Sequence, residues 1–132
     1  MMYKKPRIMI FVLFTLITTF VYAQSVTKVR YLSSLDFQKE SLITNNTLID
    51  IRTPEEFASG HLKGAKIIDF RQGDFANQIK KLNHKQTTLI YCRSGHRTES
   101  ARVEFEKQNF KEIVILKGGI QSWNSANLPM KY

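Results

Sequence analysis

The chain has 132 residues, enough for one domain, with a single cysteine and a formal charge of +9. One cysteine excludes an internal disulfide bond. The basic residues are scattered, with no run and no alternation with aromatic residues. We therefore expect no nucleic-acid partner, whereas this charge would favour small anionic substrates.

The first residues have the three parts of a secretory signal peptide. Three basic residues precede a nearly continuous apolar run at 8–21, and Val21-Tyr22-Ala23 places compact residues before a cut ahead of Gln24. The alternative is an uncleaved membrane anchor, but the run is shorter than the roughly 20 apolar residues of a spanning helix. Residues 1–23 are thus predicted to be a signal peptide, and residues 24–132 the folded domain.

Cleavage would remove three basic residues and lower the formal charge from +9 to +6. We expect an exported protein with membrane contact only through the uncleaved signal. The periplasm is the expected location, and full secretion stays open. An unpaired cysteine in an exported protein indicates either intermolecular pairing or a reactive thiol.

The first half of the mature chain predicts two strands, each followed by a helix. Residues 29–32 form a weak strand, and Ser33 caps a helix that contains Leu35, Phe37 and Leu42. Residues 47–51 are apolar and β-branched, as expected of a strand. A short helix then begins at Thr53-Pro54, because a hydroxyl group caps the first turn and proline suits the first helical position. Gly60 ends this helix.

The second half predicts three more strands and three more helices. In chain order these are a strand at 65–70, a helix at 74–82, a strand at 87–91, a helix at 98–108, a strand at 113–116 and a helix at 120–126. In the 98–108 helix, Ala101, Phe105 and Val103 are candidates for the inward face. Strands separated by helices predict an α/β fold, with a parallel sheet covered on both faces.

Cys92 follows the 87–91 strand directly and opens the segment Cys92-Arg93-Ser94-Gly95-His96-Arg97. Ligands of parallel sheets bind beyond the carboxyl ends of strands. A short glycine-containing loop before a helix directs N–H groups at one point and can hold an anion. The alternative is a buried structural cysteine, but the arginines beside Cys92 favour a reactive thiolate.

Three segments resemble the rhodanese family across nearly all of the mature sequence. The first runs from Asp50 to Ala65 and is similar to the family signature D-x-R-x-x-E-[YF]-x-x-G-H-[IL]-x-G-A; the second is the loop 92–97; the third is Gly118-Gly119 with Trp123 and Leu128-Pro129. The resemblance implies a three-layer α/β domain with a five-stranded parallel sheet flanked by helices. It also implies that Cys92 carries sulfur as a persulfide, without a cofactor or metal.

The resemblance assigns structural roles to most of the first segment. Arg52, Glu56 and His61 are expected to form a polar network that supports the loops, together with Asp50. Trp123 is expected to be a core or loop-supporting aromatic residue. Lys63 stands where the family often has proline, at an expected surface position.

The length of the cysteine loop favours sulfur transfer. Only four residues separate Cys92 from Arg97, whereas cysteine-dependent phosphatases of related architecture have one more, which widens the cradle for a phosphate ester. The expected reaction begins with attack of the Cys92 thiolate on the outer sulfur of thiosulfate, and a cyanide or thiol acceptor, such as a thiol protein, then takes the sulfur. A phosphatase or arsenate reductase is the less favoured enzyme alternative.

Substrate binding is expected from the remaining residues of the loop. Arg93 and Arg97 would neutralise the sulfonate while loop N–H groups stabilise the developing anion, and Arg97 would also bond loop carbonyls. Ser94 would donate a hydrogen bond to the persulfide or only shape the turn, and Gly95 would permit the curvature. His96 either fills an exposed position or stabilises the Cys92 thiolate.

Two other interpretations of the cysteine remain open at this point. A persulfide carrier or interaction module would load sulfur but turn over poorly with small acceptors. A redox-sensing thiol would be oxidised to sulfenic acid without forming a persulfide. The physiological donor and acceptor are not specified by the residues.

Overall fold

The computed structural model describes Met2 and residues 26–132, so the expected signal peptide, Met2 apart, lies outside the described residues. Strands and helices alternate along the described domain. The strands are β1 (Lys28–Leu32), β2 (Thr47–Asp50), β3 (Lys66–Ile67), β4 (Thr87–Tyr91) and β5 (Glu112–Leu116). The helices are α1 (Ser34–Ser41), α2 (Pro54–Ala58), α3 (Phe75–Lys80), α4 (His96–Lys107) and α5 (Gly119–Ser125).

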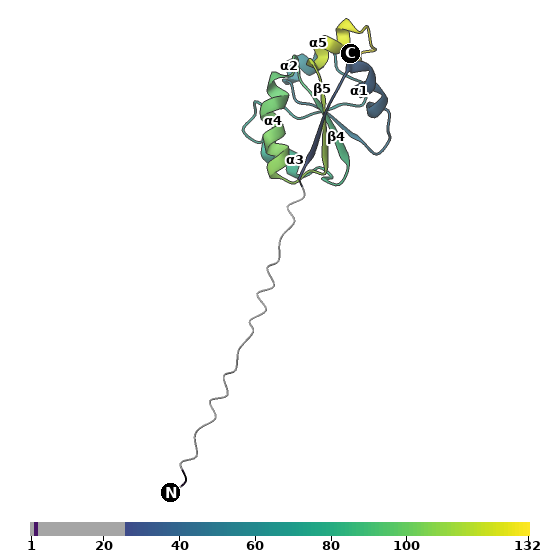
Figure 1. Ribbon diagram of the computed structural model, residues 1–132. Helices are drawn as coiled ribbons and strands as arrows, with labels where there is room; N and C mark the ends of the chain where they lie inside the picture. Colours follow the sequence, from purple (N-terminus) through teal and green to yellow (C-terminus); the bar gives the residue numbers. More distant parts are fainter. Residues whose placement is uncertain (1, 3–25) are drawn as a thin grey trace.

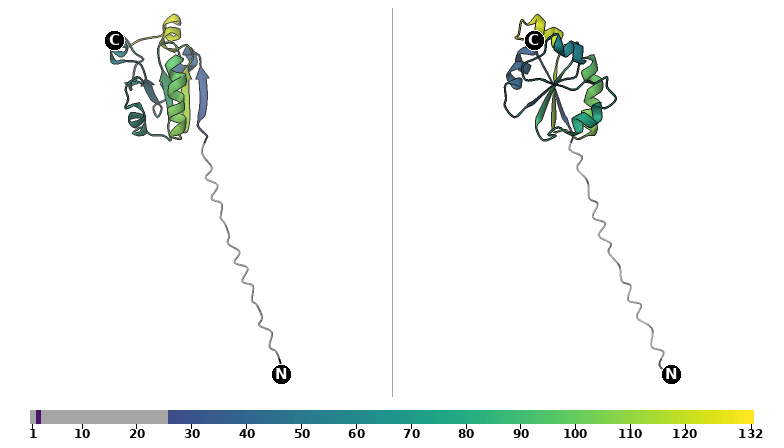
Figure 2. Two further views of the ribbon diagram at one scale, coloured as in Figure 1. Left: turned by 90° about the vertical axis from the view of Figure 1, so that its left-hand side faces the viewer. Right: turned by 180° about the vertical axis from the view of Figure 1, so that it is seen from behind.

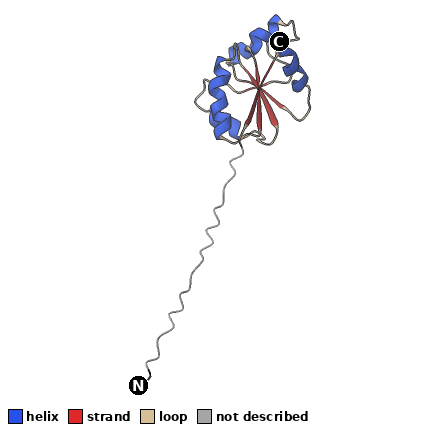
Figure 3. Ribbon diagram, in the orientation of Figure 1, coloured by secondary structure: helices blue, strands red, loops and turns tan. Residues whose placement is uncertain are grey.

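The five strands form one sheet in the order β1-β5-β4-β2-β3, and every pairing in it is parallel. In Figure 1, α3 and α4 lie on one side of the sheet and α1 lies on the other. Figure 2 shows these layers from two further directions, and Figure 3 separates the strands from the helices by colour. The α/β fold class with a five-stranded parallel sheet flanked by helices is confirmed.

The central strand β4 divides the core into two clusters, because successive side chains of a strand point to opposite faces. Ile90 and the following Cys92 pack in the cluster that includes Phe105 of α4. Leu89 and Tyr91 pack in the cluster that includes Phe37 of α1 and Trp123 of α5. Helices on both faces bury Thr88 to Tyr91 of β4, whereas Thr87 at its start is only partly buried. Burial on both faces explains why the second half of the strand, Leu89-Ile90-Tyr91, is apolar without alternation.

Several element boundaries differ from the sequence expectation. Helix α4 begins at His96, not at Thr98, because Gly95 with φ +99° turns the chain directly into the helix. The expected 65–70 strand is only β3, although the N–H of Phe70 still bonds the carbonyl of Ile51 at 3.1 Å. Helix α1 ends at Ser41, so Leu42 lies just outside the helix that was expected to contain it. Val103, a candidate for the inward face of α4, is exposed.

The part of the chain that the structure describes has no helix with the length and apolar character needed to cross a bilayer.

The C-terminal segment closes the domain by an antiparallel bridge to the loop after α2. The N–H of His61 donates to the carbonyl of Lys131 at 2.8 Å, and the N–H of Lys131 donates back at 2.7 Å. This bridge holds residues far apart in sequence side by side.

Candidate active site

Cys92 lies at the carboxyl end of the central strand, at the bottom of the loop that leads into α4. Its sulfur accepts a hydrogen bond from the N–H of Gly95, with an N···Sγ distance of 3.1 Å. Only 1% of the residue is exposed. The 92–97 loop therefore places one backbone N–H against the thiol, which is one of the donors expected of an anion cradle.

Thr98 is a neighbour of Cys92 that the sequence did not single out as a site residue. Its hydroxyl lies 3.9 Å from Sγ of Cys92 and donates to the carbonyl of Gly95 at 2.7 Å. The side chain is fully buried. Thr98 thus links the first turn of α4 to the turn of the loop and places a polar group beside the sulfur. Its position six residues after Cys92, at the expected helix start, was the available signal.

Helix α5 holds the other side of the loop through its first turn. The N–H of Ile120 donates to the carbonyl of Cys92 at 2.9 Å, and the N–H of Gln121 donates to the carbonyl of Arg93 at 3.1 Å. In a trans peptide the N–H points opposite to the C=O. Binding of these carbonyls to α5 therefore directs the N–H groups of Arg93 and Ser94 away from α5.

Gly119 allows this close approach of α5. A Cβ atom at Gly119 would lie 2.5 Å from the carbonyl oxygen of Arg93 and 2.6 Å from that of Cys92, and its φ is +61°. Any larger residue would displace the loop or the helix. The Gly118-Gly119 pair of the sequence is thus part of the site through its contact with the loop backbone.

Arg97 is bound to Glu56 and not to the loop carbonyls, which corrects that part of the expectation. Nη1 and Nη2 of Arg97 each donate to a carboxylate oxygen of Glu56 at 2.7 Å. Glu56 also accepts the N–H of Thr53 at 3.0 Å, which completes a capping box at the start of α2. The carbonyls of Cys92 and Arg93 instead accept N–H groups of α5, and that of Gly95 accepts the hydroxyl of Thr98. The ion pair joins the N-terminal turns of α2 and α4 on either side of the pocket mouth.

The ion pair changes the acid strength of both partners. Hydrogen bonding to Arg97 lowers the pKa of Glu56 to about 2, and the bond from the Thr53 N–H acts in the same direction against the effect of burial. The hydrogen bond to Glu56 likewise raises the pKa of Arg97 above its ordinary value. Glu56 is therefore a carboxylate at neutral pH, and half of the positive character expected from Arg93 and Arg97 is neutralised.

Asp50 and Arg52 form a second, separate pair behind the loop. Nε and Nη2 of Arg52 donate to the carboxylate of Asp50 at 2.7–3.1 Å, and Nη2 also donates to the carbonyl of Gly60 at 2.7 Å. Burial alone would lower the pKa of Arg52, but the bonds and charge of Asp50 raise it. Arg52 and Glu56 thus belong to two separate ion pairs, Asp50–Arg52 and Glu56–Arg97, and not to the single polar network that was expected.

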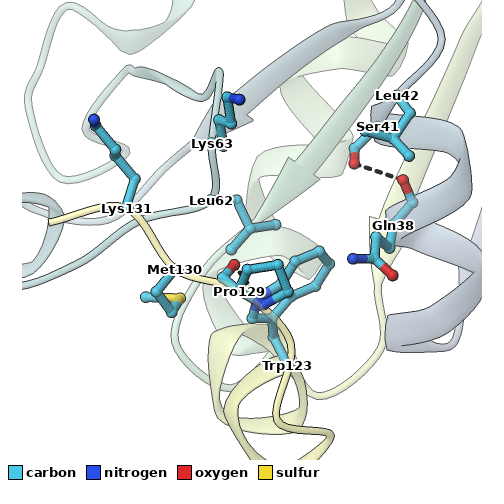
Figure 4. A pocket seen from close by; sticks show the side chains of 9 residues that line it. All are labelled: Gln38, Ser41, Leu42, Leu62, Lys63, Trp123, Pro129, Met130 and Lys131. Atoms are coloured by element: carbon cyan, nitrogen blue, oxygen red, sulfur yellow. Dashed lines mark hydrogen bonds between the residues drawn. The ribbon is translucent and has the colours of Figure 1, made fainter.

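His61 and Trp123 lie outside the loop. The His61 ring stacks on Phe57 with centroids 3.8 Å apart, and Nδ1 lies 3.0 Å from the Phe57 carbonyl. The indole N–H of Trp123 donates to the carbonyl of Pro129 at 3.1 Å. Trp123 also lines a small apolar groove with Leu62 and Met130 (Figure 4). No residue of the 92–97 loop lines this groove, so the structure separates it from the cysteine.

A polar, open pocket of 570 Å³ lies beside the cysteine loop. The loop contributes Arg93, Ser94, His96 and Arg97, and the remaining lining residues are Thr53, Glu56 and Arg71. Arg93, Ser94 and His96 lie at the surface of the loop, above the buried thiol. Cys92 does not itself line the pocket but lies beneath it.

Arg71 is a pocket residue that the sequence motifs did not mark. It follows the short strand β3, outside the three segments that carry the family resemblance.

Within the described residues, no group of three or more His, Cys, Asp or Glu side chains is arranged to hold a metal ion. The chemistry that these residues can perform is that of a thiol nucleophile beside an anion-binding mouth.

The chain belongs to the rhodanese-like domain family, because residues 34–126 match the model of that family. The matched range includes every residue of the cysteine loop and extends from α1 to the end of α5. The five-stranded architecture and the position of Cys92 after the central strand agree with this membership.

Two curated relatives have names that specify sulfur chemistry. Thiosulfate sulfurtransferase GlpE of Pseudomonas putida is 31% identical over 78 residues, which are 59% of this chain and 69% of that protein. The probable adenylyltransferase/sulfurtransferase MoeZ of Mycobacterium tuberculosis is 34% identical over 76 residues, 58% of this chain. The match spans only 19% of the length of MoeZ, so it concerns one part of that protein.

Solved structures share the fold. A rhodanese-related protein from Thermoplasma volcanium aligns with a TM-score of 0.65 and 28% identity, and the alignment covers 77% of this chain and 97% of that chain. A rhodanese-like domain protein from Staphylococcus aureus aligns with a TM-score of 0.62 at 24% identity, over 78% of this chain and 99% of that chain.

Proposed function

We propose that the protein is a thiosulfate sulfurtransferase that passes a sulfane sulfur through a persulfide on Cys92. The observation that carries the proposal is the thiol of Cys92 beneath a cationic pocket, with the Gly95 N–H bonded to its sulfur at 3.1 Å. Membership of the rhodanese-like family and the names of the GlpE and MoeZ relatives support sulfur transfer as the general activity.

The first half-reaction forms the persulfide. The Cys92 thiolate attacks the outer sulfur of thiosulfate, the S–S bond of thiosulfate breaks, and sulfite leaves with the bonding electron pair. The exposed Arg93 guanidinium at the mouth favours the approach of the sulfonate end. The Gly95 N–H, which already bonds the sulfur, stabilises the negative charge that remains on the persulfide.

The second half-reaction returns the thiolate. A nucleophilic acceptor, either cyanide or a thiol, attacks the outer sulfur of the persulfide and takes it, and the bonding electron pair returns to the Cys92 sulfur. Because Cys92 is buried and loop residues line an open pocket above it, the acceptor meets the outer sulfur first. This arrangement favours attack at the transferable atom over attack at Sγ.

The location and the mode of action belong to the same proposal. The basic and apolar pattern of residues 1–23 supports export, with the periplasm as the site of action. A lone thiol suits a persulfide relay there, because it has no intramolecular partner for a disulfide bond. A dedicated sulfur carrier would load the same persulfide but discharge slowly to small acceptors.

The test combines persulfide detection with turnover. We expect mass spectrometry after thiosulfate treatment to show one added sulfur on the peptide that contains Cys92, and thiocyanate to form when cyanide is added. Cys92→Ser should abolish both, whereas Ser94→Ala should retain the persulfide. An unmodified wild-type peptide, or thiocyanate formation by Cys92→Ser, would contradict the proposal. Full loading with slow thiocyanate formation would identify a carrier instead of an enzyme.

A further inference from the structure

The pocket above Cys92 is lined by three arginines and one carboxylate, which leaves two positive charges in excess. Arg97 is committed to Glu56 through two hydrogen bonds of 2.7 Å. Among the described residues, no hydrogen bond or ion pair engages the guanidinium groups of Arg71 or Arg93. These two side chains therefore supply the uncompensated charge of the mouth.

The backbone of Arg71 is held in place although its side chain is exposed. The carboxylate of Asp69, which is buried, accepts the N–H of Arg71 at 2.8 Å. The preceding Phe70 packs edge-on against Phe75, with ring centroids 5.1 Å apart. Both contacts fix the backbone at Arg71 and so limit the space that its guanidinium can sample. Ordering the guanidinium around a ligand therefore costs less conformational entropy.

The sheet brings Arg71 to the same edge as Cys92. The N–H of Ile68 bonds the carbonyl of Asp50 at 2.9 Å, and Asp50 pairs in register with Tyr91, the residue before Cys92. Residues 68–70 thus continue beside β2, while β2 lies beside β4. Arg71 follows β3, on one side of β4 in the strand order, whereas α5 follows β5 on the other side and binds the loop through the carbonyls of Cys92 and Arg93.

We propose that Arg71 is a substrate-binding residue that holds, together with Arg93, the doubly charged anionic end of the sulfur donor. The inference rests on the proposed sulfurtransferase function and adds a residue from outside the cysteine loop. Two guanidinium groups match the charge of a dianion such as thiosulfate, and each can give a charge-assisted hydrogen bond to a sulfonate oxygen. A donor that carries a single charge gains less from the pair.

The simpler explanation is that Arg71 is only a solvated surface residue, and the experiment is designed to separate the two. The variant is Arg71→Gln, and the matched control is Lys85→Gln, which removes one positive charge before β4, at the other end of that strand from Cys92. Arg71→Lys keeps the charge without the planar fork of donors. Persulfide formation is followed by mass spectrometry as a function of thiosulfate concentration.

We expect Arg71→Gln to raise the half-saturating thiosulfate concentration about tenfold, as for the loss of one hydrogen bond between charged groups. The limiting rate of loading, and discharge by an uncharged thiol, should stay as in the wild type. Arg71→Lys should recover part of the loss, and a singly charged thiosulfonate donor should respond less to Arg71→Gln than thiosulfate does. Lys85→Gln should have little effect on any of these quantities.

Two results would overturn the inference while the sulfurtransferase function stands. One is an equal rise of the half-saturating thiosulfate concentration in Arg71→Gln and Lys85→Gln. Arg71 would then act only through the net charge of the protein and not by binding the donor. The other is a lower limiting rate with an unchanged half-saturating concentration, which would indicate a structural role. A wild-type protein that takes no sulfur from thiosulfate would instead refute the proposed function and this inference with it.

Discussion

Glu56 decides how much positive charge the pocket presents, because it takes both terminal nitrogens of Arg97. Its carboxylate also bonds the N–H of Thr53 at the start of α2. One side chain thus stabilises a helix end, orients an arginine of the cysteine loop and offsets its charge. The family resemblance placed Glu56 among the supporting residues, but its partner could not be inferred, since the two residues are 41 positions apart in the chain.

The Glu56–Arg97 pair makes the stability of the fold depend on pH in the acid range. The pKa of Glu56 is lowered from 4.5 to about 2 in the folded protein, so the carboxylate stabilises the fold above pH 4.5. This stabilisation is lost as the pH falls through about 2. We expect Glu56→Gln to lower the free energy of unfolding by about 1 to 3 kcal/mol at neutral pH, as for a bond between charged groups. Urea denaturation measures this change.

The pH dependence gives the sharper part of this prediction. The stability difference between the wild type and Glu56→Gln should shrink as the pH falls from 4.5 toward about 2, because the wild-type carboxyl then becomes neutral as well. Glu55→Gln is the matched control, since Glu55 is the exposed acidic neighbour in the first turn of α2. A stability difference that stays constant over this range would contradict the role of the ion pair.

At the scale of elements, the site is held between three helix ends. Helix α4 provides Thr98 behind the sulfur, α5 binds the outer carbonyls of the loop, and α2 is tied to the loop through Glu56. The contact with α5 is the closest, because Gly119 lies against the backbone of Cys92 and Arg93. The position of the loop N–H groups therefore depends on the docking of α5.

Gly119→Ala should disrupt that docking. The added Cβ would lie 2.5 Å from the backbone of Arg93, and the residue has φ +61°. We expect a loss of about 1 to 3 kcal/mol in stability from strain and displacement, together with a large fall in the rate of persulfide formation. Thermal unfolding and mass spectrometry after thiosulfate treatment measure the two effects.

Two other glycines provide controls for Gly119→Ala. Gly64 has φ +84°, and a Cβ atom added there would meet no other part of the chain within 4 Å, so Gly64→Ala tests backbone strain without a clash. Gly73 has neither the positive φ nor a close neighbour and should tolerate alanine. If Gly64→Ala reduced sulfur loading as strongly as Gly119→Ala, the contact between α5 and the loop would not be the cause.

The succession of elements could be predicted from the sequence, because apolar runs, caps and glycines act locally. The buried strand β4 and the Thr53-Pro54 helix start are clear examples. The contacts of the site could not, because they depend on how distant elements meet. Arg71 enters the pocket only through the parallel pairing of β2 with β3 and β4, and the sequence around it has no motif to mark it.

At the scale of the whole molecule, the predicted cleavage site lies ahead of every strand and helix of the described domain. Its first strand begins at Lys28, and β1 pairs with β5 over five residue pairs from Lys28 to Leu32. The predicted cut before Gln24 leaves this strand intact. Processing at that point would therefore remove none of the residues that the structure describes in the sheet, in the two core clusters or in the cysteine loop.

We expect a chain that begins at Gln24 to unfold at the same urea concentration as the unprocessed chain and to load sulfur at the same rate. N-terminal sequencing of the exported protein should begin at Gln24, as the signal pattern predicts.

A chain that begins at Ser33 is the informative counterpart, because it lacks β1, leaves the edge of β5 unpaired and should be strongly destabilised. Equal stability of these two truncated chains would show that β1 does not belong to the folding unit. Lower stability of the Gln24 chain than of the unprocessed one would show that residues 1–23 contribute to the domain and would contradict their assignment as a removable signal.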